Sequence, residues 1–213
     1  MKNIGIIGSG VVARSLAVGF IQEGYSVKLG SRNPAQLQEW LDSEGEGATS
    51  GSMEEAAAHG DILVLAVGGR VAADALRLAK LENIQGKTII DPTNPISEDP
   101  PVNGVLKFTT DINYSLMEEL QAAFPEANFV KAFNSVGAHL MYKPQLEATP
   151  SMFICGNNEA AKAEVGTIVE AFGWDLEDVG AAEGARGLEP LCILWCIPGF
   201  KDNQWGHAFT WVR

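Results

Sequence analysis

The stretch Asn3-Ile4-Gly5-Ile6-Ile7-Gly8-Ser9-Gly10-Val11-Val12-Ala13 decides the fold of this chain. An apolar run typical of a strand ends in the pattern G-x-G-x-x-A, and a helical pattern follows it. Gly8 permits a tight turn, Gly10 leaves the backbone open to a pyrophosphate, and Ala13 lets the helix lie close to the strand. The free N–H groups at the start of the helix then face phosphate oxygens. This stretch therefore predicts a dinucleotide-binding βαβ unit.

The end of the second expected strand, Ser26 to Gly30, indicates which dinucleotide binds. About 20 residues after the glycine turn, NAD-binding proteins usually carry an acidic residue that binds the ribose 2′-hydroxyl. This chain has Ser31 and Arg32 at that place. A hydroxyl and a guanidinium group suit a 2′-phosphate. The sequence therefore predicts NADP as the cofactor.

The rest of the first two thirds alternates apolar strand patterns with helical patterns, which is typical of a parallel sheet. Strands are expected over 26–30, 61–67, 87–91 and 128–133, and helices over 33–41, 53–58, 71–81 and 113–124. The unbroken apolar run 61–67 favours a strand covered on both faces. We expect an α/β fold with a Rossmann-type doubly wound parallel sheet over residues 1–137. Ligands bind such sheets at the carboxyl ends of the strands.

Residues 138–213 are expected to form a small α/β C-terminal portion. Its expected elements are strands over 151–155 and 173–179 and helices over 159–172, 183–195 and 204–213. Large apolar side chains crowd the tail from Leu188 to Arg213, and four of the five Trp lie at or beyond Trp174. They can fill the core, form a dimer contact or wall a ligand pocket, and core or dimer is favoured. Because an exposed apolar patch usually marks an interface, we expect a homodimer that uses this tail.

Composition excludes several classes of function. The chain has 213 residues, a hydrophobic content of 46% and a formal charge of −12. This acidity argues against nucleic acid and anionic membranes as partners. No apolar run approaches the roughly 20 residues of a membrane span, and no signal peptide precedes the first strand, so a cytoplasmic protein is expected. Three cysteines without paired C-x-x-C spacing predict neither disulfides nor a metal site.

Five stretches that fall in the same order support a family resemblance. They are Gly8 to Ala13, Leu29 to Arg32, Asp91 to Pro95, Val130 to Ala138, and Glu189 to Leu191. With them the chain resembles the NADP oxidoreductases dependent on the deazaflavin coenzyme F-420, and related bacterial dinucleotide-binding enzymes. The resemblance covers nearly the whole chain. V-K-A-F-N-S and L-G-S-R are its most specific stretches.

In that family a nicotinamide and a deazaflavin lie face to face, and a hydride passes directly between them. The resemblance implies which residues bind: Gly8, Ser9, Gly10, Val11 and Val12 at the pyrophosphate, Ser31 and Arg32 at the 2′-phosphate, Ala66, Val67 and Asn94 along the ribose and nicotinamide, and Ala132, Asn134 and Gly137 near the reacting rings. Gly68, Gly69 and Gly137 are expected to leave room for a flat ring. The chain departs from the family at Gln36, where a further Lys often supports the phosphate, and in the proline-rich loop 92–104.

Hydride transfer between two rings needs alignment and exclusion of water rather than side-chain chemistry. We therefore expect no catalytic side chain; His139, shortly after the ring-facing stretch, is the histidine of most interest. The expected function is hydride transfer between NADP(H) and a small-molecule acceptor, either coenzyme F-420 or a flavin. Two alternatives stay open: an NADPH-dependent reductase of a quinone, metal ion or small carbonyl, and a non-enzymatic NADP(H) sensor.

Overall fold

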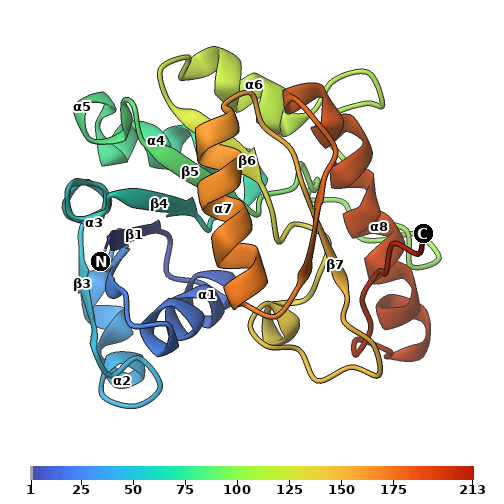
Figure 1. Cartoon of the computed structure of the whole chain (residues 1–213), viewed down its shortest axis with the longest axis horizontal. Coiled ribbons are helices and arrows are strands. Elements are labelled where there is room, and N and C mark those ends of the chain that lie inside the picture. The colour runs from blue at the N-terminus through green and yellow to red at the C-terminus, as the bar shows by residue number, and fades with distance from the viewer. Residues whose placement is uncertain (1) are drawn as a thin grey trace.

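The structure, a computed structural model, describes residues 2–213, and its centre is a six-stranded parallel sheet (Figure 1). The strands are β1 (Asn3–Ile7), β2 (Ser26–Gly30), β3 (Ala48–Gly51), β4 (Ile62–Leu65), β5 (Thr88–Asp91) and β6 (Asn128–Lys131). Their order is β3-β2-β1-β4-β5-β6, and every pair is parallel. The chain thus winds outward from β1 in one direction and, after β3, returns to wind in the other. This confirms the Rossmann-type doubly wound sheet.

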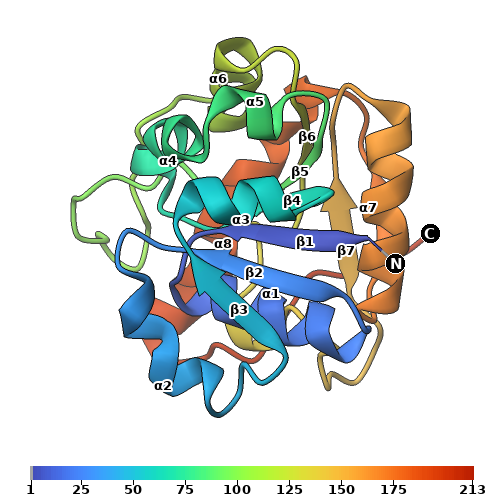
Figure 2. The same cartoon turned by 90° about the vertical axis from the view of Figure 1, so that its left-hand side faces the viewer.

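Helices cover both faces of the sheet (Figure 2). The helices of the first two thirds are α1 (Val11–Gln22), α2 (Gln38–Leu41), α3 (Met53–His59), α4 (Ala72–Ala79), α5 (Leu81–Ile84) and α6 (Leu116–Ala123), with short 3-10 turns η1 (Pro34–Leu37) and η2 (Gly69–Val71). Strand β4 shows why its sequence is apolar without a break. Ile62 and Val64 join a core cluster with α1, whereas Leu63 and Leu65 join a second cluster with α3 to α6. Alternate side chains of the strand therefore fill two different cores.

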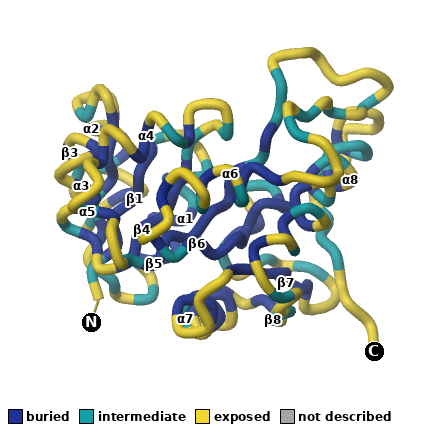
Figure 3. The backbone as a smooth tube through the Cα atoms, turned by 90° about the horizontal axis from the view of Figure 1, so that it is seen from above, coloured by how far each residue is buried: buried dark blue, intermediate teal, exposed yellow. Residues whose placement is uncertain are grey.

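The C-terminal portion is a second, smaller βαβ unit. It comprises η3 (Ala138–Leu140), β7 (Ser151–Ile154), α7 (Glu159–Ala171), β8 (Asp175–Asp178), η4 (Ala182–Gly184) and α8 (Ala185–Asp202). β7 and β8 pair in parallel, and a single antiparallel bridge, Lys131 to Cys155, links β7 to β6. Val165 of α7 and Phe172, the residue that ends this helix, belong to the same core cluster as Phe20 of α1. The inner strands β1, β4, β5 and β6 and the strand β7 are buried, whereas β3 and β8 carry exposed residues (Figure 3).

Several helix ends differ from the predicted ones for local reasons. α6 starts at Leu116 because Ser115 and Glu118 form a reciprocal capping box. The helix expected over 71–81 ends at Ala79, since Lys80 has a φ of 70°. α8 continues through Pro190 and Pro198 and stops only at Asn203, which is left-handed with a φ of 54°. None of the helices among residues 2–213 is long and apolar enough to cross a membrane.

The prediction of a helix over 204–213 is wrong. This tail is extended and runs beside β7: Ser151 N–H donates to the Phe209 carbonyl, and Trp211 N–H donates to Ser151 Oγ, both at 2.9 Å. In an extended chain alternate side chains point the same way. Phe209 and Trp211 therefore face the same side: Phe209 packs against the core cluster that contains Phe153, and Trp211 packs edge-on against Phe153 itself. Among the tail tryptophans, Trp174 and Trp195 are buried, as a core role predicts, and Trp211 stays 55% exposed.

Candidate functional site

A cleft of about 900 Å³ opens at the carboxyl ends of β1, β2 and β4. It is lined by all of the residues predicted for the pyrophosphate and the 2′-phosphate, by the first residues after β4, and by one wall of α4: Gly8, Ser9, Gly10, Val11, Val12, Ser31, Arg32, Asn33, Gln36, Met53, Ala66, Val67, Gly68, Val71, Asp74, Ala75, Leu78 and Pro92. The structure therefore brings these predicted residues together around one space. Its position at the strand ends, beside the start of α1, is that of dinucleotide sites in doubly wound sheets.

The glycine turn has the geometry that a pyrophosphate needs. Gly8 has a φ of +139°, and a Cβ there would lie 2.0 Å from the Ala66 carbonyl oxygen. At Gly10, by contrast, a Cβ would meet nothing within 4 Å, so the backbone is open on the cleft side. Gly10 also begins α1 without a side-chain cap. The first N–H groups of α1 are thus left for an anion such as pyrophosphate.

Ser31 and Arg32 lie at the β2 end of the same cleft. Ser31 is 8% exposed, its Oγ lies 3.2 Å from Ser9 Oγ, and it accepts a hydrogen bond from Asn33 N–H at 3.1 Å. These bonds fix the hydroxyl between the glycine turn and the β2 loop. Arg32 is exposed and has no carboxylate partner among residues 2–213. Its guanidinium is therefore available to an incoming anion.

The last residue of η2 and helix α4 supply an apolar wall that the sequence analysis did not single out. Val71 and Leu78 line the cleft and are each 51% exposed, with Ala75 between them. Exposed valine and leucine on a cleft wall suit a flat apolar group better than water. The sequence pattern that could have indicated this wall is the helical spacing of Val71, Ala75 and Leu78. These three residues form an apolar face that lines the cleft, beside the face of α4 that packs into the core.

Four predicted residues do not line this cleft: Asn94, Ala132, Asn134 and Gly137. Ala132 is fully buried within the core. The expectation that Gly69 and Gly137 leave open space is wrong. A Cβ on Gly69 would lie 2.1 Å from the Asn94 carbonyl oxygen, and one on Gly137 would lie 2.6 Å from the Trp195 ring. Of these three glycines, Gly68 alone borders open space. Gly69 instead lets the 92–95 loop pack closely, and Gly137 lets α8 do so.

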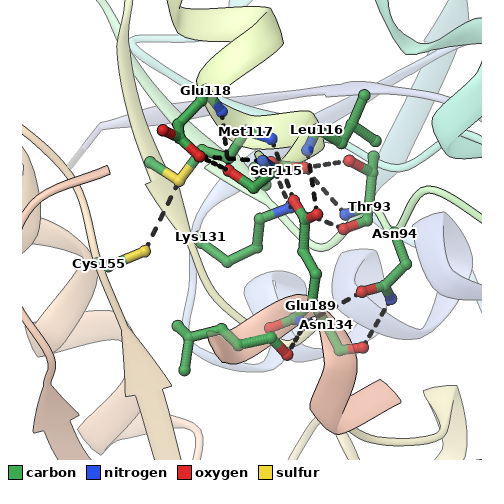
Figure 4. A network of polar contacts seen from close by, with 12 residues as sticks. Thr93, Asn94, Ser115, Leu116, Met117, Glu118, Lys131, Asn134, Cys155 and Glu189 are labelled. Carbon is green, nitrogen blue, oxygen red and sulfur yellow. Dashed lines mark hydrogen bonds and ion pairs between the residues drawn. The ribbon is translucent and has the colours of Figure 1, made fainter. Parts of the chain in front are cut away.

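The two asparagines bind each other at the ends of β5 and β6. Asn94 Nδ2 donates to the Asn134 carbonyl at 2.7 Å, and Asn134 Nδ2 donates to Asn94 Oδ1 at 3.1 Å. Asn134 Nδ2 also donates to the Leu188 carbonyl of α8 at 2.8 Å (Figure 4). These bonds tie together the two strand ends predicted for the nicotinamide and the first half of α8.

Beside this pair lies a buried ionic network that the sequence analysis missed. Lys131 Nζ lies 2.8 Å from Asp91 Oδ2 and 3.0 Å from Glu189 Oε1, and it donates to the Thr93 carbonyl at 2.7 Å. The side chains of Lys131 and Asp91 are 0% exposed and that of Glu189 is 2% exposed. Burial alone would lower the pKa of Lys131, but the Asp91 and Glu189 carboxylates outweigh it and raise that pKa. The ammonium therefore stays charged at neutral pH.

Glu189 has a second role in the same network. Its two carboxylate oxygens accept the N–H groups of Leu116 and Met117, each at 3.0 Å, and so cap the start of α6 from α8 (Figure 4). The network thus joins β5, β6, α6 and α8 through one carboxylate. The three charged members, Asp91, Lys131 and Glu189, lie in stretches that carried the family resemblance. The sequence alone does not reveal that one ammonium and two carboxylates share a buried space.

A second cavity, of about 580 Å³, lies on the other side of the start of α1. It shares Ser9, Gly10 and Val11 with the cleft; its further lining residues are Arg14, Ser15, Val18, Trp40, Glu44, Ala138, His139 and Tyr142. Arg14 Nε donates to the Ser9 carbonyl at 3.1 Å. The turn Ser9 to Val11 is therefore a thin wall between two cavities.

The cysteines lie away from these cavities. Burial raises the pKa of Cys155 to about 12, so its thiol stays protonated. Residues 2–213 contain no group of three or more His, Cys, Asp or Glu side chains placed to hold a metal ion.

Comparison with known proteins identifies the family of this chain. Residues 3–95 match the family described as NADP oxidoreductase, coenzyme F-420-dependent. A solved structure from Arthrobacter sp. FB24, provisionally described as an F-420-dependent NADP-reductase, is 31% identical with a TM-score of 0.92, and each chain covers 100% of the other. A hypothetical protein from Sinorhizobium meliloti is 25% identical with a TM-score of 0.72, over 85% of this chain and 86% of that one.

Among curated proteins, metalloreductase STEAP3 of Rattus norvegicus is 31% identical over 199 residues, which make up 92% of this chain and 38% of that protein. Human metalloreductase STEAP2 is 29% identical over 92% of this chain and 37% of its own length. The chain thus spans less than two fifths of the curated relatives it matches. From the full-length match to the Arthrobacter protein, and the family match across the glycine turn and strands β1 to β5, the chain belongs to the NADP oxidoreductases dependent on coenzyme F-420.

Proposed function

We propose that this protein is an oxidoreductase that passes a hydride between NADP(H) and a flavin-type ring, either a flavin or the deazaflavin of coenzyme F-420. The observation that carries the proposal is the cleft in which the open glycine turn, Ser31 and the unpaired Arg32 face one space. Bound NADPH supplies the hydride, and the acceptor takes that hydride and one proton from solvent. The protein contributes binding and alignment.

Each part of the cleft has a task in this proposal. The backbone N–H groups that follow Gly10 bind the pyrophosphate, and Arg32 with Ser31 binds the 2′-phosphate. The apolar wall of Val71 and Leu78 packs against the adenosine half of the cofactor. Ala66 and Val67 then direct the nicotinamide half toward the ends of β4 and β5.

The acceptor ring is proposed to lie beyond the nicotinamide, near the turn from Asn134 to Ala138. The bonds between Asn94, Asn134 and α8, together with the buried Lys131 network, hold that turn in place. Rigid support of this kind matters because small displacements of reacting rings cost about a hundredfold in rate. Residues 1–137 would then supply the cofactor site, and residues 138–213 would close the acceptor side.

The test is an anaerobic absorbance assay with NADPH and oxidised coenzyme F-420 or flavin mononucleotide (FMN). Bleaching of the acceptor's visible band at a rate proportional to enzyme supports the proposal. NADPH binding without turnover of either acceptor would favour the non-enzymatic sensor instead.

Metal-ion reduction is a second candidate, and the metalloreductase relatives favour it. A hydride carries two electrons whereas a metal ion such as Fe³⁺ accepts one, so this reaction also needs a ring that divides the pair. Reduction of ferric chelate by NADPH that depends on added flavin would support this candidate. Flavin reduction that is unchanged by the chelate, with no Fe²⁺ formed, would exclude it.

We also propose a homodimer built on α8 and the tail. Leu194 and Phe200 of α8 are 55% and 47% exposed, and Val102 and Val105 of the proline-rich loop are 70% and 44% exposed. A Cβ on Gly104 would lie only 3.2 Å from the Ile197 carbonyl oxygen, so this loop packs against α8. Apolar patches of this kind are usually covered by a partner. Light scattering at micromolar concentration should give twice the monomer mass, and Leu194→Asp should lower it; a monomeric parent protein would contradict the proposal.

A further inference from the structure

Two arginines stand apart from the others. Arg70, Arg77, Arg186 and Arg213 each pair with a carboxylate. Arg14 and Arg32 have no such partner among residues 2–213, although the chain carries 27 acidic residues against 15 basic ones. Both line a cavity at the glycine turn, Arg32 the cleft and Arg14 the second cavity. In so acidic a protein, an arginine left unpaired at a cavity wall indicates a site for an anion that the protein itself does not supply.

The second cavity has the other groups that such an anion needs. Arg14 Nε donates to the Ser9 carbonyl, which fixes the side chain. The two terminal guanidinium nitrogens are then available to a ligand in the cavity that Arg14 lines. His139 is exposed, lines the same cavity and makes no hydrogen bond within residues 2–213. Ser15 adds a hydroxyl, and the rings of Trp40 and Tyr142 form apolar walls. Glu44 is the carboxylate of the lining and takes part in none of the ion pairs found among residues 2–213.

We infer that this cavity binds the phosphate-bearing side chain of the acceptor. The inference rests on the proposed function and deepens it. Flavin mononucleotide and coenzyme F-420 share one chemistry: a flat ring, a polyhydroxylated chain and a phosphate. Arg14 and His139 donate to the phosphate, Glu44 accepts from the chain hydroxyls, and Ala138 and His139 lie directly after Gly137 at the turn proposed for the ring.

The position of Arg14 separates this site from that of the cofactor. Arg14 does not line the cleft, and Arg32 does not line the second cavity. The turn Ser9 to Val11 stands between the two anions, with one unpaired arginine on each side. Arg32 then binds the cofactor and Arg14 binds the acceptor. Replacing Arg14 should change the KM of the acceptor, whereas replacing Arg32 should change the affinity for NADPH.

The experiment compares acceptors with and without phosphate on one enzyme. With NADPH saturating, KM is measured for FMN against riboflavin, and for coenzyme F-420 against a 5-deazaflavin that ends in ribitol. In Arg14→Gln the KM of the phosphate-bearing acceptors should rise tenfold or more, as expected for loss of a charge-assisted contact. The KM of the phosphate-free acceptors and the dissociation constant of NADPH should change less than twofold. Arg14→Lys should restore part of the loss, and Arg70→Gln, at neither cavity, should change nothing.

His139→Gln tests the same site through an exposed residue without internal bonds, so it covers the case in which Arg14→Gln does not fold. It should raise the KM of the phosphate-bearing acceptors alone. Equal effects on acceptors with and without phosphate would overturn the inference. A rise in the NADPH dissociation constant as large as the rise in KM would also overturn it, because Arg14 would then serve the cofactor.

Binding measured without turnover keeps this inference apart from the proposed function. Quenching of flavin fluorescence gives dissociation constants for FMN and riboflavin even if no hydride passes. Tighter binding of FMN that is lost in Arg14→Gln supports the phosphate site although the proposed reaction fails. Reduction of both flavins with equal KM in the parent protein supports the reaction and refutes the phosphate site.

Discussion

Replacing Glu189 with Gln tests whether the buried network holds the acceptor side of the site. Glu189 Oε1 accepts from Lys131 Nζ and from Met117 N–H, each at 3.0 Å, and Oε2 accepts from Leu116 N–H at 3.0 Å. Glutamine has nearly the same shape, but its NH₂ group must face either Lys131 or an N–H of α6, where a donor meets a donor. Lys131 also loses one of two carboxylate partners while it remains 0% exposed.

The expected effect is large because a buried charge is left partly uncompensated. Removing one partner of a buried pair typically costs about 3–5 kcal/mol. For a domain of this size each kcal/mol lowers Tm by about 2–4 °C, so a fall of roughly 6–20 °C is expected by calorimetry and urea unfolding. Turnover at 20 °C should fall more than NADPH affinity, since the network and the Asn94–Asn134 hydrogen bonds hold the turn Asn134 to Ala138 proposed for the acceptor.

The matched control is Glu98→Gln, which also removes a carboxylate from an ion pair, here with Arg70, but from a side chain that is 76% exposed. Its effect on the free energy of unfolding should stay within about 0.5 kcal/mol. The double variant Lys131→Met/Glu189→Gln should be less destabilised than the sum of its single variants, since the two share one contact. If Glu189→Gln costs no more than the control, the network does not support the fold and this reasoning is refuted.

Three further predictions concern the cleft and the acid range. Arg32→Ala should weaken NADPH by about 1.5–3 kcal/mol, roughly ten- to a hundredfold, and leave NADH nearly unchanged; equal losses in fluorescence titrations would contradict the NADP assignment. Gly8→Ala should destabilise the protein and abolish cofactor binding, because its φ is +139° and its Cβ would lie 2.0 Å from the Ala66 carbonyl oxygen; a normal Tm would refute this. Hydrogen bonds from Arg186 lower the pKa of Glu118 from 4.5 to about 2, so this carboxylate stabilises the fold above pH 4.5 and the contribution is lost as pH falls toward 2. Glu118→Gln should therefore flatten the pH dependence of unfolding between pH 4.5 and 2, and an unchanged profile would count against it.

The sequence predicted the parts of the fold that depend on local pattern. The glycine turn, the apolar strand 61–67 and the alternation of strands and helices that predicts a parallel sheet each follow from the residues themselves. Helix α3 starts at Met53, as predicted, and the capping box of Ser52 and Glu55 sets that start. The residues proposed to bind the phosphates could be picked out of the sequence for the same reason, since they follow directly after strands.

The rest depends on contacts between distant segments. The tail 204–213 is extended because Ser151 offers its N–H and Oγ to the tail, which no helical periodicity could show. Gly137 packs against Trp195, 58 positions later in the chain, so its lack of a side chain serves packing rather than ligand access. The Lys131 network likewise joins residues from four separate stretches, in β5, β6, α6 and α8.

The most direct test of the proposed reaction follows one hydrogen atom. NADPH carrying deuterium at C4, on one face or the other of the nicotinamide, is mixed with coenzyme F-420 and the enzyme under argon. The hydrogen at C5 of the reduced deazaflavin is bound to carbon and does not exchange with water, so mass spectrometry records its origin. Direct ring-to-ring transfer predicts one deuterium in the product from one face of NADPH and none from the other. Reduced F-420 without deuterium from either labelled NADPH, or no reduction of F-420 or flavin at all, would contradict the proposal.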